Sequence, residues 1–253
     1  MISLLESLLL GVIQGITEWL PISSSGHLAL LHNLFGFQDL PFDVFLHFAS
    51  IFAVLVIFRK DIIKLFNFKD KSNLKYIGLL IIALIPAGIF GVFFKDQIEN
   101  FFSSLFYLGI FFMLSGIIVY STKFSNSTKE NPTFFDSIFI GFFQALAILP
   151  GISRSGATIS SSLFRGLKKD SAVKFSFLLA IPLVLGATIL EAKDIILGDI
   201  NYSLLLISFA VTFLVSIITI KILLKLIQNK KFYVFGIYNF VLGILILISN
   251  FFI

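Results

Sequence analysis

The 253-residue sequence contains no cysteine and few charged side chains. The absence of cysteine excludes disulfides, thiolate metal sites and cysteine nucleophiles. Asp, Glu, Lys and Arg together make up 13% of the residues, whereas a typical soluble domain carries about 25%. Hydrophobic residues make up 58%, Phe alone contributes 33 residues, and the mean hydropathy is +1.02. This composition predicts an integral membrane protein.

Long apolar runs predict how the chain crosses the membrane. Six of them are long enough to span a bilayer with modest tilt or thinning: Phe42–Phe58, Tyr76–Phe94, Leu105–Tyr120, Phe175–Leu190, Ser203–Ile222 and Tyr233–Phe252. Alternating strands typical of a membrane β-barrel do not occur. We therefore expect an all-α polytopic membrane protein with six transmembrane helices. The stretch Met1–Leu20 lacks a basic leader and a small-residue cleavage site, so we expect it in the mature fold.

Two shorter apolar stretches, Ile2–Leu20 and Phe134–Leu149, each run into a segment rich in Pro, Ser and Gly. These segments read LPISSSGHL (Leu20–Leu28) and LPGISRSGATI (Leu149–Ile159). Proline ends a helix, and Ser and Gly tolerate a turn, so each segment should separate two short helices. Such a pair predicts a re-entrant helical hairpin, which needs protein or a cavity to satisfy its freed backbone groups.

The two broken segments are copies of one motif. GVIQGITEWLPISSSG (Gly11–Gly26) aligns with GFFQALAILPGISRSG (Gly141–Gly156). Three predicted spans separate the copies, and an odd number inverts the second copy, so both tips should meet near the midplane. This inverted-topology repeat is typical of secondary transporters. We expect one domain over 1–253, with repeat one over about 1–120, repeat two over about 134–253 and a polar loop over 121–133.

Charged residues predict the orientation. Lys and Arg gather in the loop Arg59–Lys75, around Arg165 and around Lys225, whereas the loop Glu191–Tyr202 is mainly acidic. The positive-inside rule then places the basic segments in the cytoplasm and both termini outside. These loops account for the net charge of +5. No basic face with base-reading chemistry is present, so we expect no nucleic-acid partner.

The first motif carries an acid and a histidine that the second motif lacks. Gln14 and Glu18 lie four residues apart, so their oxygens share one face of a helix and could hold Mg²⁺ or Ca²⁺. A polar packing pair is the alternative, although a carboxylate in an apolar run favours function. Ser23, Ser24 and Ser25 could cap the next helix, bind phosphate or supply a nucleophile beside His27.

The second motif carries Arg154, whose planar guanidinium matches phosphate oxygens in pairs. An arginine in an apolar setting needs a partner, and a structural ion pair with Glu18 is the alternative to phosphate. Hydroxyls and free N–H groups at both breaks would complete a phosphate cradle, made of Ser23, Ser25, Gly26, Ser153, Ser155, Gly156 and Thr158. We interpret His32 and His47 as core or interface histidines, and expect Asp43 at the outer mouth of the site.

Both motifs closely resemble the two signature motifs of the undecaprenyl-diphosphate phosphatase family, of the bacitracin-resistance type. The segment KKDSAVKFSFLLAIP (Lys168–Pro182) is similar to the family's sequence after its second motif. The resemblance extends over essentially the whole chain and implies a phosphatase that removes the terminal phosphate of undecaprenyl diphosphate. It implies a divalent cation and a site that opens to the extracytoplasmic side of the bacterial cytoplasmic membrane.

Residue by residue, the resemblance implies that Gln14 and Glu18 are the metal-side pair, with Ser24, His27 and Arg154 as further catalytic residues. The family often has Glu where this chain has Gln14, which weakens the expectation that Gln14 binds metal directly. Ser24 is favoured as nucleophile or orienting hydroxyl with His27 as acid/base, and attack by His27 stays open. The expected partners are a polyprenyl diphosphate and membrane lipids, with room for a homodimer.

A second function competes with hydrolysis. The inverted repeat also suits a lipid-phosphate flippase or an anion transporter that works by alternating access. A site that only binds phosphate would need Arg154 but would have little use for Glu18 beside His27. The chemical asymmetry of the two motifs therefore favours an integral-membrane phosphatase.

Overall fold

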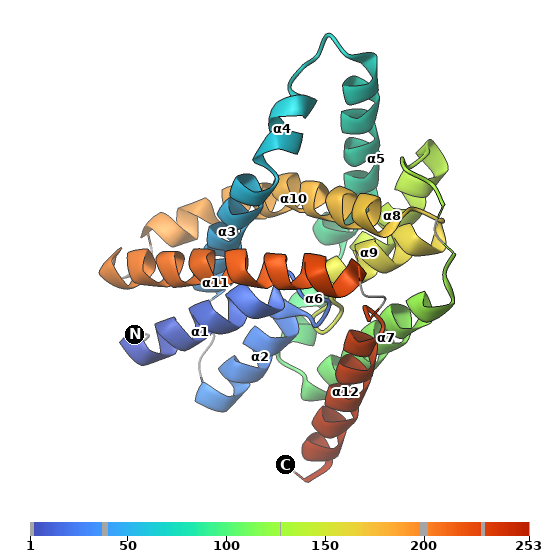
Figure 1. Ribbon diagram of the computed structural model, residues 1–253. Helices are drawn as coiled ribbons and strands as arrows, with labels where there is room; N and C mark the ends of the chain where they lie inside the picture. Colours follow the sequence, from blue (N-terminus) through green and yellow to red (C-terminus); the bar gives the residue numbers. More distant parts are fainter. Residues whose placement is uncertain (1–2, 37–39, 127, 198–201, 229–230, 253) are drawn as a thin grey trace.

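The computed structural model describes residues 3–36, 40–126, 128–197, 202–228 and 231–252 (Figure 1). The regular structure of these ranges is helical, apart from one isolated bridge between Lys129 and Leu167. In chain order the helices are α1 (Leu4–Thr17), α2 (Ser24–Phe35), α3 (Leu40–Ile57), α4 (Arg59–Leu65), α5 (Lys71–Phe93), α6 (Lys95–Phe102), α7 (Leu105–Ser121), the 3₁₀ turn η1 (Thr122–Phe124), α8 (Phe134–Leu146), α9 (Arg154–Phe164), α10 (Lys169–Leu197), α11 (Tyr202–Gln228) and α12 (Val234–Phe252).

Six of these helices are long and apolar enough to cross a membrane: α3, α5, α7, α10, α11 and α12. They coincide with the six predicted spans, so the expected all-α membrane protein is confirmed. Their ends differ from the apolar runs. Helix α5 begins before the expected Tyr76, because Asp70 accepts the Ser72 N–H and starts the helix at Lys71. Helix α10 continues to Leu197, where an acidic loop was expected, because Glu, Ala, Lys and Leu favour helix.

The two copies of the motif adopt the same local structure. Helix α1 begins with a capping box between Ser3 and Glu6, and α8 begins with one between Thr133 and Asp136. Both helices end shortly before a proline, and a second short helix, α2 or α9, follows the break. Each short helix packs against its partner, α1 against α2 and α8 against α9. The predicted helix–break–helix arrangement is therefore present twice.

Small residues let the longer helices approach closely. Helices α7 and α12 lie side by side (Figure 1), and a Cβ added at Gly116 would lie 2.8 Å from the Gly236 carbonyl oxygen. A Cβ at Gly243 would lie 2.6 Å from the Gly109 carbonyl oxygen. In a bilayer, where lipid is as apolar as leucine, such close backbone contact is a main source of helix association. The glycines therefore fix α12 against α7.

The two halves of the chain exchange helix contacts. Helix α1 packs against α11, which follows the second motif, and α8 packs against α5, which follows the first. Helices α3 and α10 pack against each other. Their shared core contains the single tryptophan, Trp19, whose ring lies 4.8 Å from that of Phe177. The breaks are thus enclosed by helices from both halves.

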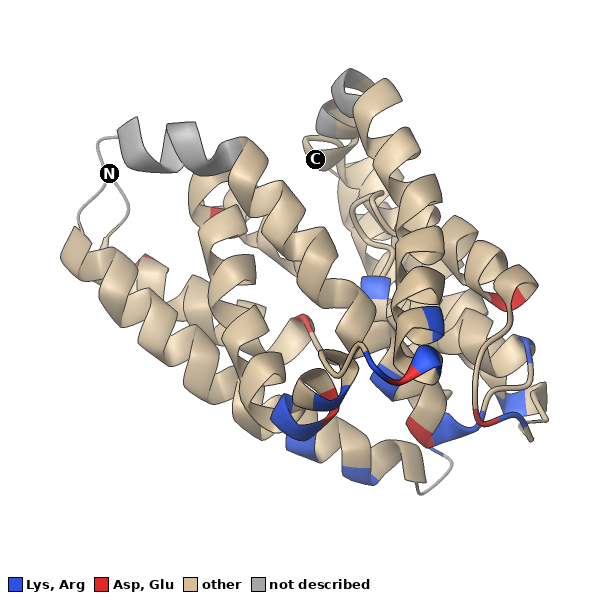
Figure 2. Ribbon diagram, turned by 90° about the horizontal axis from the view of Figure 1, so that it is seen from above, with Lys and Arg blue, Asp and Glu red and all other residues tan. Residues whose placement is uncertain are grey.

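Charged side chains are concentrated on one side of the molecule. Figure 2 shows most of the described Lys and Arg residues gathered along one edge. Asp136, which is fully buried, is paired with Lys129 and Arg165. Lys174 of α10 also forms an ion pair with Asp61 of α4. Among the residues that the structure describes, the opposite edge in this view carries few basic residues.

Candidate active site

The two helix breaks meet inside the protein. A Cβ added at Gly26 would lie 2.9 Å from the Gly151 Cα, so the backbones of the two breaks touch. Ser155 of the second motif donates its hydroxyl to the Leu20 carbonyl of the first, at 3.1 Å. Gly151 has a φ of 100°, a conformation that favours glycine. The predicted meeting of the two motifs is therefore observed as direct contact.

A buried asparagine joins the two breaks from a third helix. Asn239 of α12 donates to the Pro21 carbonyl at 2.7 Å and to the Ser115 hydroxyl at 3.3 Å. The same Ser115 hydroxyl of α7 accepts the backbone N–H of Ser153 at 3.1 Å. Asn239 and Ser115 thus hold one break each and are themselves hydrogen-bonded, which fixes the separation of the two motifs.

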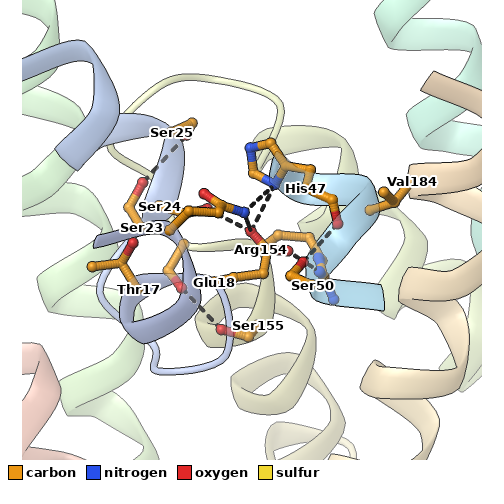
Figure 3. Close-up of polar contacts among 12 residues, drawn as sticks. Thr17, Glu18, Ser23, Ser24, Ser25, His47, Ser50, Arg154, Ser155 and Val184 are labelled. Carbon is orange, nitrogen blue, oxygen red and sulfur yellow. Dashed lines mark hydrogen bonds and ion pairs between the residues drawn. The ribbon is translucent and has the colours of Figure 1, made fainter. Parts of the chain in front are cut away.

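Glu18 lies at the centre of the site and is 5% exposed (Figure 3). Its Oε2 accepts the Ser24 hydroxyl at 2.6 Å and the Gln14 amide at 3.1 Å. The Nδ1 atom of His47 lies 2.8 Å from the same oxygen. Arg154 binds the other oxygen, Oε1, through its Nη2. Four side chains from α1, α2, α3 and α9 therefore converge on one carboxylate.

The sequence left two partners open for Arg154, namely Glu18 and a phosphate. Its ion pair with Glu18 is present, and its guanidinium also lies over the Trp19 ring, 5.4 Å from the centroid. The side chain is 11% exposed, and its Nη1 atom is buried without a hydrogen-bond partner. Nη2 is thus engaged, and Nη1, which has no partner among the described residues, is left to bind an acceptor such as a phosphate oxygen.

The serines at the breaks act first as helix caps. Ser23 accepts the Gly26 N–H at 3.3 Å, and Ser153 accepts the Gly156 N–H at 3.0 Å. Ser23 adopts a φ of 69°, which is rare for a residue with a side chain. Ser25 lies 3.4 Å from the Ser23 hydroxyl. The capping interpretation is therefore confirmed for Ser23, and Ser153 caps its helix in the same way. Ser24 is the serine that contacts Glu18.

Thr158 and His27 lie apart from the Glu18 cluster. Thr158 donates to the Arg154 carbonyl at 2.8 Å and lies 2.6 Å from the Ser176 hydroxyl, so its polar group is used in helix packing. His27 places Nδ1 2.7 Å from the Ser23 carbonyl oxygen and Nε2 2.8 Å from the Tyr238 hydroxyl. The acid/base role of His27 and the phosphate-binding role of Thr158 stay predictions.

Comparison with known proteins places the chain in a family. The model of the family described as bacitracin resistance protein BacA matches residues 7–245. The chain belongs to the BacA family. It is 37% identical to an undecaprenyl-diphosphatase of Alkaliphilus metalliredigens, over 97% of this chain and 98% of that protein. It is 39% identical to one of Methanococcus vannielii (96% and 99% covered) and 40% identical to one of Carboxydothermus hydrogenoformans (96% of each).

In this BacA-family chain, sequence analysis missed His47. Its interpretation as a core or interface histidine left out the contacts of the ring with both Glu18 and Gln14. His32, by contrast, is paired with Asp43, with His32 Nε2 2.7 Å from the carboxylate. A signal for His47 was present: a polar ionisable residue inside a transmembrane run points to function by default. Glu18 and Arg154 were predicted on this ground, and His47 of α3 carries the same signal.

The metal expected for a BacA-family chain can be tested against the oxygens present. Gln14 Oε1 is buried and has no hydrogen-bond partner among the described residues, so its lone pairs are open to a cation. Within the described ranges, no group of three or more His, Asp or Glu residues could hold a metal ion. Mg²⁺ is often bound by one or two protein oxygens, with substrate phosphate and water completing its shell. Gln14 and Glu18 fit such a site.

Proposed function

We propose that this chain removes the terminal phosphate of undecaprenyl diphosphate and releases undecaprenyl phosphate, the lipid carrier reused in cell-wall synthesis. The observation that carries the proposal is the buried Glu18, which accepts the Ser24 hydroxyl on one oxygen and Arg154 on the other. This arrangement unites a base, a hydroxyl nucleophile and a phosphate-binding cation at the junction of the two breaks. Family relatives that carry the name undecaprenyl-diphosphatase support the same activity.

Ser24 is the proposed nucleophile. Its oxygen bonds to the terminal phosphorus, the bond from that phosphorus to the bridging oxygen breaks, and Glu18 Oε2 takes the hydroxyl proton. Undecaprenyl phosphate leaves with the bridging oxygen. Water then attacks the phosphorus of the phosphoserine, and the bond between that phosphorus and the Ser24 oxygen breaks. Inorganic phosphate leaves with the water oxygen, and Glu18 returns the proton to the Ser24 oxygen. The 2.6 Å contact between Ser24 and Glu18 supports this assignment.

Arg154 is proposed to bind the transferred phosphoryl group through Nη1, the guanidinium nitrogen without a partner. Charge stabilisation of this kind is the main requirement of phosphoryl transfer. A low-dielectric setting strengthens the interaction, because the site is walled by apolar helices. Ser25, Ser155 and the N–H groups near Gly26 and Gly156 are proposed to complete the phosphate cradle.

Gln14 Oε1 and Glu18 are the proposed protein ligands of a divalent cation, Mg²⁺ or Ca²⁺. Such an ion would neutralise charge on the diphosphate and polarise its phosphoryl oxygens. Four side chains already contact the Glu18 carboxylate, so cation binding would require at least one of them to move away. His27 is proposed as an auxiliary acid/base or as an alternative nucleophile, with Tyr238 positioning its ring through Nε2.

The finer architecture is part of the same proposal. The two broken helix pairs are proposed to be re-entrant hairpins of an inverted repeat, which the reciprocal packing of α1 on α11 and α8 on α5 supports. The basic side (Figure 2) is proposed to face the cytoplasm of the bacterial inner membrane, with the site open to the extracytoplasmic side. The prenyl tail would lie among apolar helices. A homodimer stays a prediction.

The decisive experiment measures inorganic phosphate released from undecaprenyl diphosphate by the purified protein, with Mg²⁺, with Ca²⁺ and with EDTA. Arg154→Ala and Ser24→Ala should abolish release, and Arg59→Ala, a change on the basic side, should not. Metal-dependent release lost in both site variants supports the phosphatase. No release by monodisperse protein with either metal would overturn it, and transport of lipid phosphate into vesicles would then be measured.

A further inference from the structure

His47 is a side chain of the site that neither motif contains. It belongs to α3, a helix that lies outside both breaks and packs against α10 and α11. Its Nδ1 lies 2.8 Å from Glu18 Oε2 and 2.8 Å from Gln14 Nε2 (Figure 3). Gln14 Nε2 in turn donates to Glu18 Oε2 at 3.1 Å. The three groups therefore form a closed triangle around one carboxylate oxygen.

We infer that His47 is a positioning residue, which holds Glu18 Oε2 in place for the Ser24 hydroxyl through its Nδ1 atom. This inference rests on the proposed function, because Oε2 is the oxygen proposed to take the Ser24 proton. Arg154 binds only Oε1 and so leaves rotation of the carboxylate to other contacts. His47 and Gln14 supply these contacts from two different helices, which fixes the oxygen in two directions.

Either tautomer of His47 performs this role. With a proton on Nδ1, the ring donates to Glu18 Oε2 directly. Without it, Nδ1 accepts one hydrogen of the Gln14 amide, whose second hydrogen goes to the same carboxylate oxygen. In both cases the group beside Oε2 is fixed by an atom attached to the His47 Cγ. The position of that atom, rather than the charge of the ring, is what the site uses.

The ring of His47 contributes little to the anchoring of its own helix. Helix α3 is held by buried apolar residues, among them Ile51, Ala53 and Val54, that face the shared core. The His47 side chain is 24% exposed, and its Nδ1 contacts Glu18 rather than that core. Removal of the ring should therefore leave the fold intact while it releases Glu18.

Two amides of different length test which ring atom matters. Asparagine carries its amide nitrogen and oxygen on Cγ, where His47 carries Nδ1, whereas glutamine carries them one bond farther out. We expect His47→Ala and His47→Gln to lower kcat for phosphate release roughly 100-fold, the cost of a misplacement of about 1 Å. His47→Asn should restore most of the rate. KM should change little in all three variants, because Arg154 binds the substrate.

Controls separate positioning from folding and from the proposed function. His32→Ala removes a buried histidine that is paired with Asp43, and it should leave kcat unchanged. Thermal unfolding followed by the single Trp19 should give the same midpoint for all His47 variants. If the wild-type protein releases no phosphate, the proposed function is wrong. The positioning of Glu18 by His47 is then tested only by the crystal structures of the variants.

Crystal structures of the variants supply that second measurement. Glu18 Oε2 should stay within hydrogen-bond distance of Ser24 Oγ in His47→Asn and move away in His47→Ala. An unmoved carboxylate in His47→Ala would overturn the inference. An unchanged kcat in His47→Ala, or a change in KM alone, would also overturn it. The same holds if all three variants lose kcat and also unfold at a lower midpoint.

Discussion

The buried carboxylate of Asp136 makes the free energy of unfolding of the protein dependent on pH. Arg165 donates to it at 2.7 Å, Lys129 at 3.1 Å and the Thr133 backbone N–H at 2.9 Å. Burial acts to raise the pKa of Asp136, but the hydrogen bonds from Thr133, Arg165 and Lys129 outweigh it and hold the pKa at about 2. Asp136→Asn removes the charge from this cluster.

The expected loss follows from the shift in pKa. The ordinary pKa of this carboxyl is 3.8, so the depression of nearly two units corresponds to about 2 kcal/mol of stability at neutral pH. Because the folded pKa is the lower one, this stability is present above about pH 4 and is lost as the pH falls toward about 2. Asparagine leaves Lys129 and Arg165 unpaired, but both are at least 40% exposed and can be solvated by water.

The assay is thermal unfolding in detergent, followed by tryptophan fluorescence between pH 7 and pH 3. At pH 7 Asp136→Asn should lower the midpoint by roughly 4–8 °C, at about 2–4 °C per kcal/mol, and the difference should shrink as the pH falls below 4. Glu130→Gln is the matched control, because its ion pair with Lys168 is half or more exposed and should contribute little. Equal midpoints at pH 7, or a difference as large at pH 3 as at pH 7, would refute this account.

Three further substitutions test the site and the packing around it. Glu18→Gln should abolish phosphate release and cost about 3–5 kcal/mol, because it leaves the Arg154 guanidinium buried and unpaired; the double variant with Arg154→Gln should regain stability but not activity. Gly26→Ala should cost roughly 1–3 kcal/mol by overpacking, since its Cβ would lie 2.5 Å from an aromatic ring of α7, whereas Gly88→Ala, with open space around it, should be neutral or stabilising in the same unfolding assay. Asn239→Ala should cost roughly 1–3 kcal/mol through the carbonyl it leaves unpaired, and unchanged stability would contradict its role between the breaks.

The helical architecture could be predicted because the membrane restricts the chain. Six apolar runs of sufficient length coincide with six helices, and the two Pro–Ser–Gly segments coincide with two breaks. In lipid every backbone polar group needs an internal partner, so hydropathy and proline position carry most of the information. The helix boundaries were less predictable, since α5 and α10 extend beyond their apolar runs. A capping residue starts α5 early, and helix propensity extends α10.

The candidate site was predicted only where a motif brought its residues together. Glu18, Ser24 and Arg154 belong to the two motifs, and the structure joins them. His47 and Asn239 reach the site from α3 and α12, so their role depends on helix packing that local sequence does not specify. His27 shares a motif with Glu18, yet helix geometry turns its ring toward Tyr238. Proximity in sequence is thus a weak guide to proximity within a bundle.

The hydrogen bond from Asn239 to the Pro21 carbonyl has a consequence for biosynthesis. The two residues are 218 positions apart, so the first break to leave the ribosome is completed by the last helix. At about 5–20 residues per second, the first motif waits on the order of 10–40 seconds for that partner. A nascent chain therefore lacks this contact, and the first break stays without its partner until α12 has entered the membrane.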